Sequence, residues 1–314
     1  MSYYQVSHTD KLSGDIVIQG SKNASLPTIA AAILNKGTTV IKNCPDISDV
    51  RNMIKILGHL GCKCEFKKNI LVIESENVNL SDIPKEDVSK LRSSVVLIGA
   101  LLGRNNEVEM SYPGGCNIGQ RKIDVHIEAL REIGYEVIEN ENGVRCFGKI
   151  YRDSYVRLRL QSVGATENTI LASVISDGYI VRISNAAREP EIVNLCNCLN
   201  EMGAKVYGAG NDEIIVEGVK NLHDGEVIID ADRIVAGTYM AAVTAIGGKV
   251  YFKNIEKNFD NAILKELKKF GMEYLFDDDK MCVEKNNNKL IFERDITVST
   301  GTYPKFPPDM QSQI

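Results

Sequence analysis

The chain repeats one pattern of secondary structure, and this repeat limits its possible folds more than any other feature. In three places a turn glycine is followed by a β-favouring run and an asparagine: residues 37–43, 178–185 and 248–254. Apolar residues at helical spacing after each asparagine predict an amphipathic helix. Each helix is expected to end at a glycine, 17 or 18 positions after the asparagine, with a strand behind it: Gly61, Gly203 and Gly271.

A helix rich in small residues is expected before each β-run: residues 24–34, 166–175 and 235–246. The repeating unit is therefore helix, strand, helix, strand and a further strand, with a period of about 60 to 70 residues. Another copy lies between the first two, with a helix at 88–102, a β-run at 107–112 and a second helix that ends at Gly134. These copies together predict an α/β fold built from repeated units.

The intervening copy carries a glycine-rich loop, Pro-Gly-Gly-Cys-Asn-Ile-Gly-Gln-Arg, at 113–121. From Tyr112 to Gly134 there are 22 positions, so the loop is an insertion relative to the sister copies. Its glycines let the backbone approach a ligand closely, and Arg121 offers a forked cation for phosphate or carboxylate. A thiol near cations can act as an acid, base or nucleophile, which makes Cys116 the candidate reactive cysteine. The alternative is a surface turn with an incidental cysteine, but insertions in repeated scaffolds commonly carry function.

Charge and composition argue against several classes of protein. The net charge is −5 and no basic block is present, which argues against binding nucleic acid through bulk electrostatics. The N-terminus has no apolar run behind a basic start, and other apolar stretches are too short to span a bilayer, so we expect no membrane association. The length predicts about two domains, and the cytoplasm is the expected compartment.

The eight cysteines show neither a disulfide framework nor the spacing of a zinc site. Cys62 and Cys64 are expected on one face of a strand, whereas Cys196 and Cys198 are expected on a helix, where they do not lie side by side. The four histidines are scattered and suggest no triad or cage. We therefore expect neither a metal site nor a cofactor.

Six motifs occur in a fixed order along the chain. They are Gly-Ser-Lys-Asn-Ala at 20–24, the loop at 113–121, Ser-Val-Gly-Ala-Thr-Glu at 162–167, Asn-Ala-Ala-Arg-Glu-Pro-Glu-Ile at 185–192, Asp-Arg-Ile with Gly-Thr at 232–238, and Phe-Pro-Pro-Asp-Met-Gln at 306–311. With them the chain resembles the UDP-N-acetylglucosamine 1-carboxyvinyltransferases, a family of enolpyruvyl transferases. The likeness runs from residue 11 to the C-terminus.

The resemblance implies two similar lobes, each an inside-out α/β barrel of three repeats, with the active site in the cleft between them. Residues 1–21 with 231–314 would form an incomplete first lobe, and residues 22–230 a second lobe that carries the catalytic loop, 112–122. The implied reaction transfers enolpyruvate from phosphoenolpyruvate to the 3-hydroxyl of UDP-N-acetylglucosamine and releases phosphate. This is the first committed step of peptidoglycan synthesis, and it links the protein to cell-wall biogenesis, cell shape, cell division and the cell cycle.

Phosphoenolpyruvate carries a phosphate and a carboxylate, so its site needs several cations. The resemblance points to Lys22, with its neighbour Asn23, and to Arg92 and Arg121. Lys22 comes just ahead of a small-residue helix whose N-terminal amides can add to anion binding. Lys22 could equally be a solvated lysine and Arg92 a surface helix arginine; the resemblance favours the site.

The resemblance also implies where the nucleotide binds. The residues that would line the pocket for its uracil end are Arg121, Lys122, Ile123, Asp124 and Val125. Ser162, Val163 and Gly164 precede a helix and could present backbone and hydroxyl groups to the diphosphate, although a serine that only caps the helix would look the same. Arg188 and Glu189 could form ion pairs with the other lobe or with the closing loop. The pair at 232–233 is expected to hold structure near the junction of the lobes.

The reaction needs a proton delivered to a methylene carbon and a base for the sugar hydroxyl. By resemblance Cys116 lies on a mobile loop that closes over the site, serves as an acid or aids product release, and is the target of fosfomycin. Asp309 is the matching base. Because Pro307-Pro308 predicts a helix start, the dipole there favours the charged carboxylate, so we expect Asp309 to orient the hydroxyl as much as deprotonate it. A carboxylate with only a helix-starting role is the alternative.

The sequence departs from the family at its C-terminal end. It stops at Ile314, a few residues into what resembles a fifth copy, so about a hundred residues of the family pattern are not matched. The apolar faces that those residues would cover predict a complementing C-terminal segment as a partner, besides the two substrates. Two alternatives stay open: a catalytically impaired nucleotide-sugar-binding fragment, and a 3-phosphoshikimate 1-carboxyvinyltransferase, which the loop and the motif at 185–192 disfavour.

Overall fold

The computed structural model describes residues 3, 5, 7–114, 122–257, 259, 261–277, 280–286 and 296–314. The chain divides into two compact units. The central unit is Gly20–Asp230, and the terminal unit joins Met1–Gln19 to Ala231–Ile314. Each unit has its own hydrophobic core. In the described part of the chain, no helix is long and apolar enough to cross a membrane.

The described part of the central unit contains three separate four-stranded sheets. One has the order β13 (Gly225–Ile228), β2 (Thr38–Lys42), β4 (Ile70–Glu74), β3 (Lys63–Lys67). The second has β5 (Asp82–Ile83), β6 (Glu107–Ser111), β8 (Gly143–Gly148), β7 (Tyr135–Glu139), and the third β9 (Ser154–Arg157), β10 (Ile180–Ser184), β12 (Glu213–Glu217), β11 (Lys205–Tyr207). In every sheet the first pair is parallel and the other two pairs are antiparallel.

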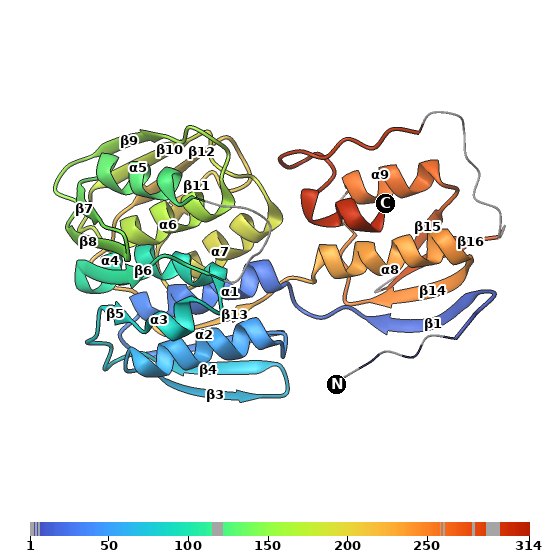
Figure 1. Cartoon of the computed structure of the whole chain (residues 1–314), viewed down its shortest axis with the longest axis horizontal. Coiled ribbons are helices and arrows are strands. Elements are labelled where there is room, and N and C mark those ends of the chain that lie inside the picture. The colour runs from blue at the N-terminus through green and yellow to red at the C-terminus, as the bar shows by residue number, and fades with distance from the viewer. Residues whose placement is uncertain are drawn as a thin grey trace. The chain divides into compact units, whose positions relative to one another are not determined.

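The helices of the central unit lie between the sheets, as Figure 1 shows. Three small-residue helices are buried on nearly all sides: α1 (Lys22–Ala31), which continues as the 3₁₀ helix η1 (Ala32–Leu34), α4 (Leu97–Asn105) and α6 (Val163–Val174). The amphipathic helices are α2 (Ser48–His59), α5 (Asp124–Glu132) and α7 (Pro190–Glu201). Two short helices, α3 (Lys85–Val88) and η2 (Arg92–Val96), precede α4.

Small and hydroxyl residues explain why the inner helices can pack so closely. A Cβ at Gly103 of α4 would lie 2.7 Å from Leu34 Cδ2 and 2.8 Å from the Leu171 carbonyl oxygen of α6. Buried hydroxyls of α6 satisfy themselves within the helix, since Thr169 Oγ1 donates to Ala165 O at 2.7 Å and Ser173 Oγ to Thr169 O at 2.6 Å. These two hydroxyls therefore need no water.

The glycines and asparagines of the repeat serve defined backbone purposes. The glycines that follow α2, α5, α7 and α9 (Asn261–Lys269) all have φ between 85° and 113°, which side chains rarely allow. Asn43, Asn185 and Asn254 also have positive φ, from 55° to 60°. Their side-chain amides donate to the carbonyl just beyond the parallel neighbour strand, at 2.6–2.7 Å. Each asparagine thus fastens one strand end to a strand from a distant part of the chain.

Among its described residues, the terminal unit contains one sheet and one copy of the repeat. Its strands are β1 (Leu12–Val17), β14 (Gly248–Lys253), β16 (Lys280–Lys285) and β15 (Glu273–Asp277), in that order. Its helices are α8 (Arg233–Ile246), α9 (Asn261–Lys269) and the 3₁₀ helix η3 (Pro308–Gln313). Asp232 caps α8 by accepting from the N–H groups of Ile234 and Val235. This capping agrees with the structural role expected for Asp232.

The predicted α/β fold is confirmed, and the structure differs from the prediction in several details. Every sheet has a fourth strand that the repeat pattern did not reveal, such as β9, and the central unit's sheets share no strand. The helix predicted at 88–102 is confirmed over residues 92–102, as η2 and α4, but its start is wrong: the chain extends at Leu91, with φ −134° and ψ 103°, between α3 and η2. Cys62 lies just before β3 rather than on it, whereas Cys196 and Cys198 lie on a helix as predicted.

Candidate functional site

Several predicted site residues of the central unit meet where the first turns of α5 and α6 lie beside η2. Helix α6 packs against both α5 and η2, and α1 packs against η2. These contacts gather residues from four segments that are far apart in the sequence. The helix starts supply N–H groups without intrahelical partners, and η2 supplies the cation Arg92.

Ser162 is the N-cap of α6. Its Oγ accepts from the Ala165 N–H at 3.3 Å, and its carbonyl oxygen accepts from Thr166 Oγ1 at 2.8 Å. The structural alternative for Ser162 is thus confirmed, because its hydroxyl caps the helix. The backbone N–H groups of Val163 and Gly164 belong to the first turn, which has no carbonyl of its own to bind them. They are suited to donate to an anion.

The segment predicted to line the uracil pocket forms the start of α5. Lys122 and Asp124 are exposed, whereas Ile123 and Val125 are 4% and 7% exposed and belong to the core. Only the backbone of those two apolar residues can therefore face a ligand. Asp124 Oδ1 accepts from the Val125 N–H at 3.0 Å. Sequence reasoning did not foresee that half of this segment faces inward.

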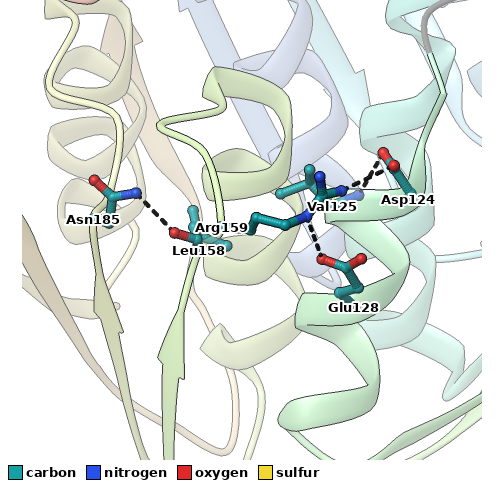
Figure 2. A network of polar contacts seen from close by, with 6 residues as sticks. All are labelled: Asp124, Val125, Glu128, Leu158, Arg159 and Asn185. Atoms are coloured by element: carbon teal, nitrogen blue, oxygen red, sulfur yellow. Dashed lines mark hydrogen bonds and ion pairs between the residues drawn. The ribbon is translucent and has the colours of Figure 1, made fainter.

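Arg159 lies beside Asp124 and was not predicted from the sequence. Figure 2 shows its side chain extending to α5, where it pairs with Asp124 at 2.9 Å and Glu128 at 3.2 Å. Burial raises the pKa of Asp124, but the hydrogen bonds from Arg159 and Val125 outweigh it and leave the pKa below its ordinary value. The Asn185 amide donates to Leu158 O at 2.7 Å and so fixes the backbone next to Arg159.

His126 connects α5 to the start of α6. It is 8% exposed, and a Cβ at Gly164 would lie 2.8 Å from its Cε1 and 3.3 Å from its Nε2. Burial, and next the charge of Arg92, lower the pKa of His126 to about 4. The imidazole is therefore neutral at physiological pH. His126 directly follows the segment predicted to bind the nucleotide, which could have identified it as a candidate. It was not selected because the four histidines are scattered along the sequence.

Lys22 is the first residue of α1, not a residue ahead of it, and Ser21 caps this helix by accepting from the Ala24 N–H at 3.3 Å. The Lys22 ammonium is half-exposed and lies 3.5 Å from Asp49 Oδ2. A cation at a helix N-terminus opposes the helix dipole, so it adds nothing to the stability of α1 by that route. Asn23 follows on the same turn, and Arg92 is partly buried on the neighbouring η2.

Two predicted residues, Cys116 and Arg121, lie outside the described residues. Burial raises the thiol pKa of several described cysteines to about 12, which makes them poor nucleophiles: Cys44, Cys62, Cys146, Cys196 and Cys198. Across the described ranges, no group of three or more His, Cys, Asp or Glu residues could hold a metal ion.

Asp309 belongs to the terminal unit. It lies in the first turn of η3, and Pro307 occupies the N-cap position. The predicted helix start is confirmed, although the helix is a 3₁₀ helix. Met310 anchors the turn against α8, because a Cβ at Gly237 would lie 2.6 Å from its Sδ. Gln313 Nε2 donates to Thr238 Oγ1 at 3.2 Å and holds the other end of η3.

Buried carboxyl groups lie near the motif at 185–192. Burial, and next the charges of Glu191 and Glu189, raise the pKa of Glu167 in α6 to about 8. Glu167 is therefore largely protonated at neutral pH. The Nε of Arg188, in the same motif, is buried without a hydrogen-bond partner. No sequence signal marked Glu167 as different from an ordinary helix glutamate.

Comparison with known proteins identifies the family of this chain. A family model described as EPSP synthase (3-phosphoshikimate 1-carboxyvinyltransferase) matches residues 6–314. The UDP-N-acetylglucosamine 1-carboxyvinyltransferase 2 of Caldanaerobacter subterraneus subsp. tengcongensis is 42% identical over all 314 residues. The chain belongs to the enolpyruvyl transferase family. The protein of the same name from Carboxydothermus hydrogenoformans is 35% identical, and the chain spans 74% of the length of each of these two relatives.

Solved structures of enolpyruvyl transferases have the same fold. The enolpyruvyl transferase NikO from Streptomyces tendae superimposes with a TM-score of 0.75 at 17% identity, over 88% of this chain and 66% of that one. EPSP synthase from Acinetobacter baumannii gives a TM-score of 0.67, also at 17% identity, over 88% of this chain and 65% of its own. The resemblance inferred from six motifs is therefore confirmed at the level of family and fold.

Proposed function

We propose that this chain is a UDP-N-acetylglucosamine enolpyruvyl transferase. The observation that carries the proposal is the meeting of the first turns of α5 and α6 beside Arg92, which forms an anion-binding surface on the central unit. A nucleotide diphosphate is an anion of this kind. The names of the 42% and 35% identical relatives supply the rest of the substrate, because both act on UDP-N-acetylglucosamine.

In this proposal the sugar nucleotide binds to the central unit. The N–H groups of Val163 and Gly164 donate to its diphosphate, and the Ser162 N-cap keeps them oriented. The segment 121–125 contacts the uridine through backbone atoms and its exposed side chains. Arg159 holds the start of α5 in place through Asp124 and Glu128.

The chemical step is an addition followed by an elimination. The sugar 3-hydroxyl adds to C2 of phosphoenolpyruvate while C3 accepts a proton; loss of phosphate and of a C3 proton then gives the enolpyruvyl ether. We assign Lys22, Arg92 and Arg121 to the anionic groups of phosphoenolpyruvate, with Asn23 beside them. We assign Cys116 to proton delivery or product release, and Asp309 to the hydroxyl group.

The biological setting follows from this reaction. The product commits the sugar nucleotide to peptidoglycan, so we propose a role in cell-wall synthesis, cell shape and division, carried out in the cytoplasm. We also propose that Cys116 is the residue that fosfomycin alkylates, because the sequence places it close to Arg121 and Lys122, and a thiol near cations is more reactive than the buried thiols described above.

Phosphate release from phosphoenolpyruvate tests the function. We expect release only when UDP-N-acetylglucosamine is present, and none with shikimate 3-phosphate as the acceptor. Replacing Asp309 by Asn should abolish release without preventing nucleotide binding. If the chain alone is inactive, the last quarter of the Caldanaerobacter relative is added as a separate segment. Failure of both mixtures to release phosphate, with sugar-nucleotide binding retained, would support the binding-protein alternative.

A further inference from the structure

Asn168 is a fully buried amide that joins three helical elements of the central unit. Its Oδ1 accepts from the Gly99 N–H of α4 at 2.6 Å, and its Nδ2 donates to Val95 O of η2 at 3.0 Å. A backbone N–H can only donate and a carbonyl oxygen can only accept. These two contacts therefore fix which end of the amide is oxygen and which is nitrogen.

The third contact of Asn168 determines the form of His126. Nδ2 lies 2.8 Å from His126 Nδ1 and has a second hydrogen to donate. Nδ1 must then be the acceptor, so the single proton of the neutral ring is on Nε2. A protonated imidazole would direct an N–H from Nδ1 at the N–H of Asn168. The hydrogen-bond geometry thus opposes the charged ring for a reason separate from burial.

The Nε2 side of the ring faces the start of α6. Its Cε1 and Nε2 are the atoms that a Cβ at Gly164 would meet, at 2.8 and 3.3 Å. Val163 and Gly164 supply backbone N–H groups at the same place, and Arg92 is near enough for its charge to act on the ring. The Nε2–H therefore lies among other donors, at a site suited to an anion.

We propose that Asn168 is a positioning residue that holds His126 as a neutral Nε2–H donor, directed at a phosphate oxygen of the bound sugar nucleotide. The identity of the ligand rests on the function proposed above, whereas the tautomer does not. A neutral donor beside Arg92 avoids repulsion between two cations, and its hydrogen bond persists over the pH range in which an ordinary histidine would titrate.

NMR of the four histidines, labelled with ¹⁵N, tests the tautomer directly. In the full chain the His126 signal, assigned by its loss in H126Q, should report the Nε2–H form from pH 5.5 to 8. Asn168→Asp places an acceptor oxygen opposite Nδ1, so the proton should move to Nδ1 or the ring should become charged within this range. An unchanged His126 signal in a folded Asn168→Asp protein would overturn the proposal.

A matched pair at position 126 tests the donor without altering Asn168. The amide nitrogen of H126Q can replace Nε2–H, whereas H126N reaches only as far as Nδ1. We expect H126N to bind UDP-N-acetylglucosamine about ten- to a hundredfold more weakly by calorimetry, and H126Q to recover most of the loss. Equal affinities for both variants, or weaker binding by H126Q, would contradict the proposal.

The two parts of the experiment separate this inference from the proposed function. If the parent chain does not bind UDP-N-acetylglucosamine, the proposed function fails and so does the phosphate contact of His126. The histidine spectrum would still decide whether Asn168 sets the tautomer. If the parent binds but the spectrum shows an Nδ1–H ring, the positioning role is wrong and the function stands.

Discussion

A buried carboxyl group gives the protein a measurable dependence of stability on pH. The pKa of Glu167 is raised from 4.5 to about 8, first by burial and then by Glu191 and Glu189. Between these values the folded chain keeps a proton that the unfolded chain has released. Stability therefore falls as pH rises, by about 1.4 kcal/mol per pH unit and by about 5 kcal/mol across the whole interval.

The substitution Glu167→Gln imitates the protonated carboxyl and removes this dependence. His126 acts in the opposite direction, because its pKa is lowered from 6.5 to about 4 and the unfolded chain takes up the proton first as pH falls. Its contribution is complete above pH 6.5 and is lost as pH falls toward 4. The titrations of Glu167 and His126 overlap below pH 6.5, so the pH profile of the parent's stability does not by itself report on Glu167. The difference in free energy of unfolding between variant and parent cancels the contribution of His126 and isolates that of Glu167.

Urea unfolding followed by circular dichroism at pH 5, 6, 7 and 8 provides the assay. The free energy of unfolding of the variant should rise relative to that of the parent by about 1.4 kcal/mol for each pH unit, from near pH 5 up to pH 8. Glu191→Gln should narrow the pH range over which stability falls, because it removes the larger of the two charges that raise the pKa of Glu167, while burial still raises it. A difference between E167Q and the parent that stays constant from pH 5 to pH 8 would refute the reasoning.

Substitutions at three other positions test packing and backbone geometry. Gly164→Ala should weaken UDP-N-acetylglucosamine binding about tenfold by calorimetry, because its Cβ meets the fixed ring of His126; unchanged affinity would contradict that placement. Gly103→Ala should destabilise the protein by about 1–2 kcal/mol in urea, since crowding against Leu171 O outweighs the helix propensity gained; a more stable variant would show that α4 and α6 have room. Asn185→Ala should cost about 2–3 kcal/mol and Asn185→Gly about 1, because both lose the bond to Leu158 O but only alanine is strained at φ 55°; equal costs would count against the strain argument.

Local signals predicted the repeat well because they act over a few residues. The glycine after each amphipathic helix and the asparagine after β2, β10 and β14 were visible in the sequence, and both have positive φ in the structure. The reason for the asparagine was not visible, since Asn43 bonds to Ile229, 186 positions away. The four residues of β9 are too short a run to predict a strand from the sequence alone, although Tyr155 and Val156 favour one, and parallel pairing with β10 stabilises it.

The extended residue Leu91, which separates α3 from η2, shows that helix propensity alone does not determine where a helix begins. No proline or glycine separates α3 from α4, so the local pattern favours one continuous helix. Packing overrides it: Leu91 is buried, and its carbonyl oxygen accepts from Ser94 Oγ at 2.6 Å.

The sequence motifs predicted several residues of the candidate site, but not the contacts between them. Ser162–Gly164 and the start of α5 were identified in the sequence, and the structure brings them together. His126, Asn168 and Arg159 were missed because their contacts join segments far apart, with 42 positions between His126 and Asn168 and 35 between Asp124 and Arg159. A pattern confined to a few neighbouring residues cannot predict such long-range contacts.

Hydrogen–deuterium exchange of the full chain with and without UDP-N-acetylglucosamine tests the central claim most directly. The account predicts slower exchange at the first turns of α5 and α6, including the amides of Val125, Val163 and Gly164, with little change in the outer strands of the central sheets. Protection confined to other segments, under conditions where calorimetry shows the nucleotide bound, would contradict the placement of the diphosphate at these helix starts.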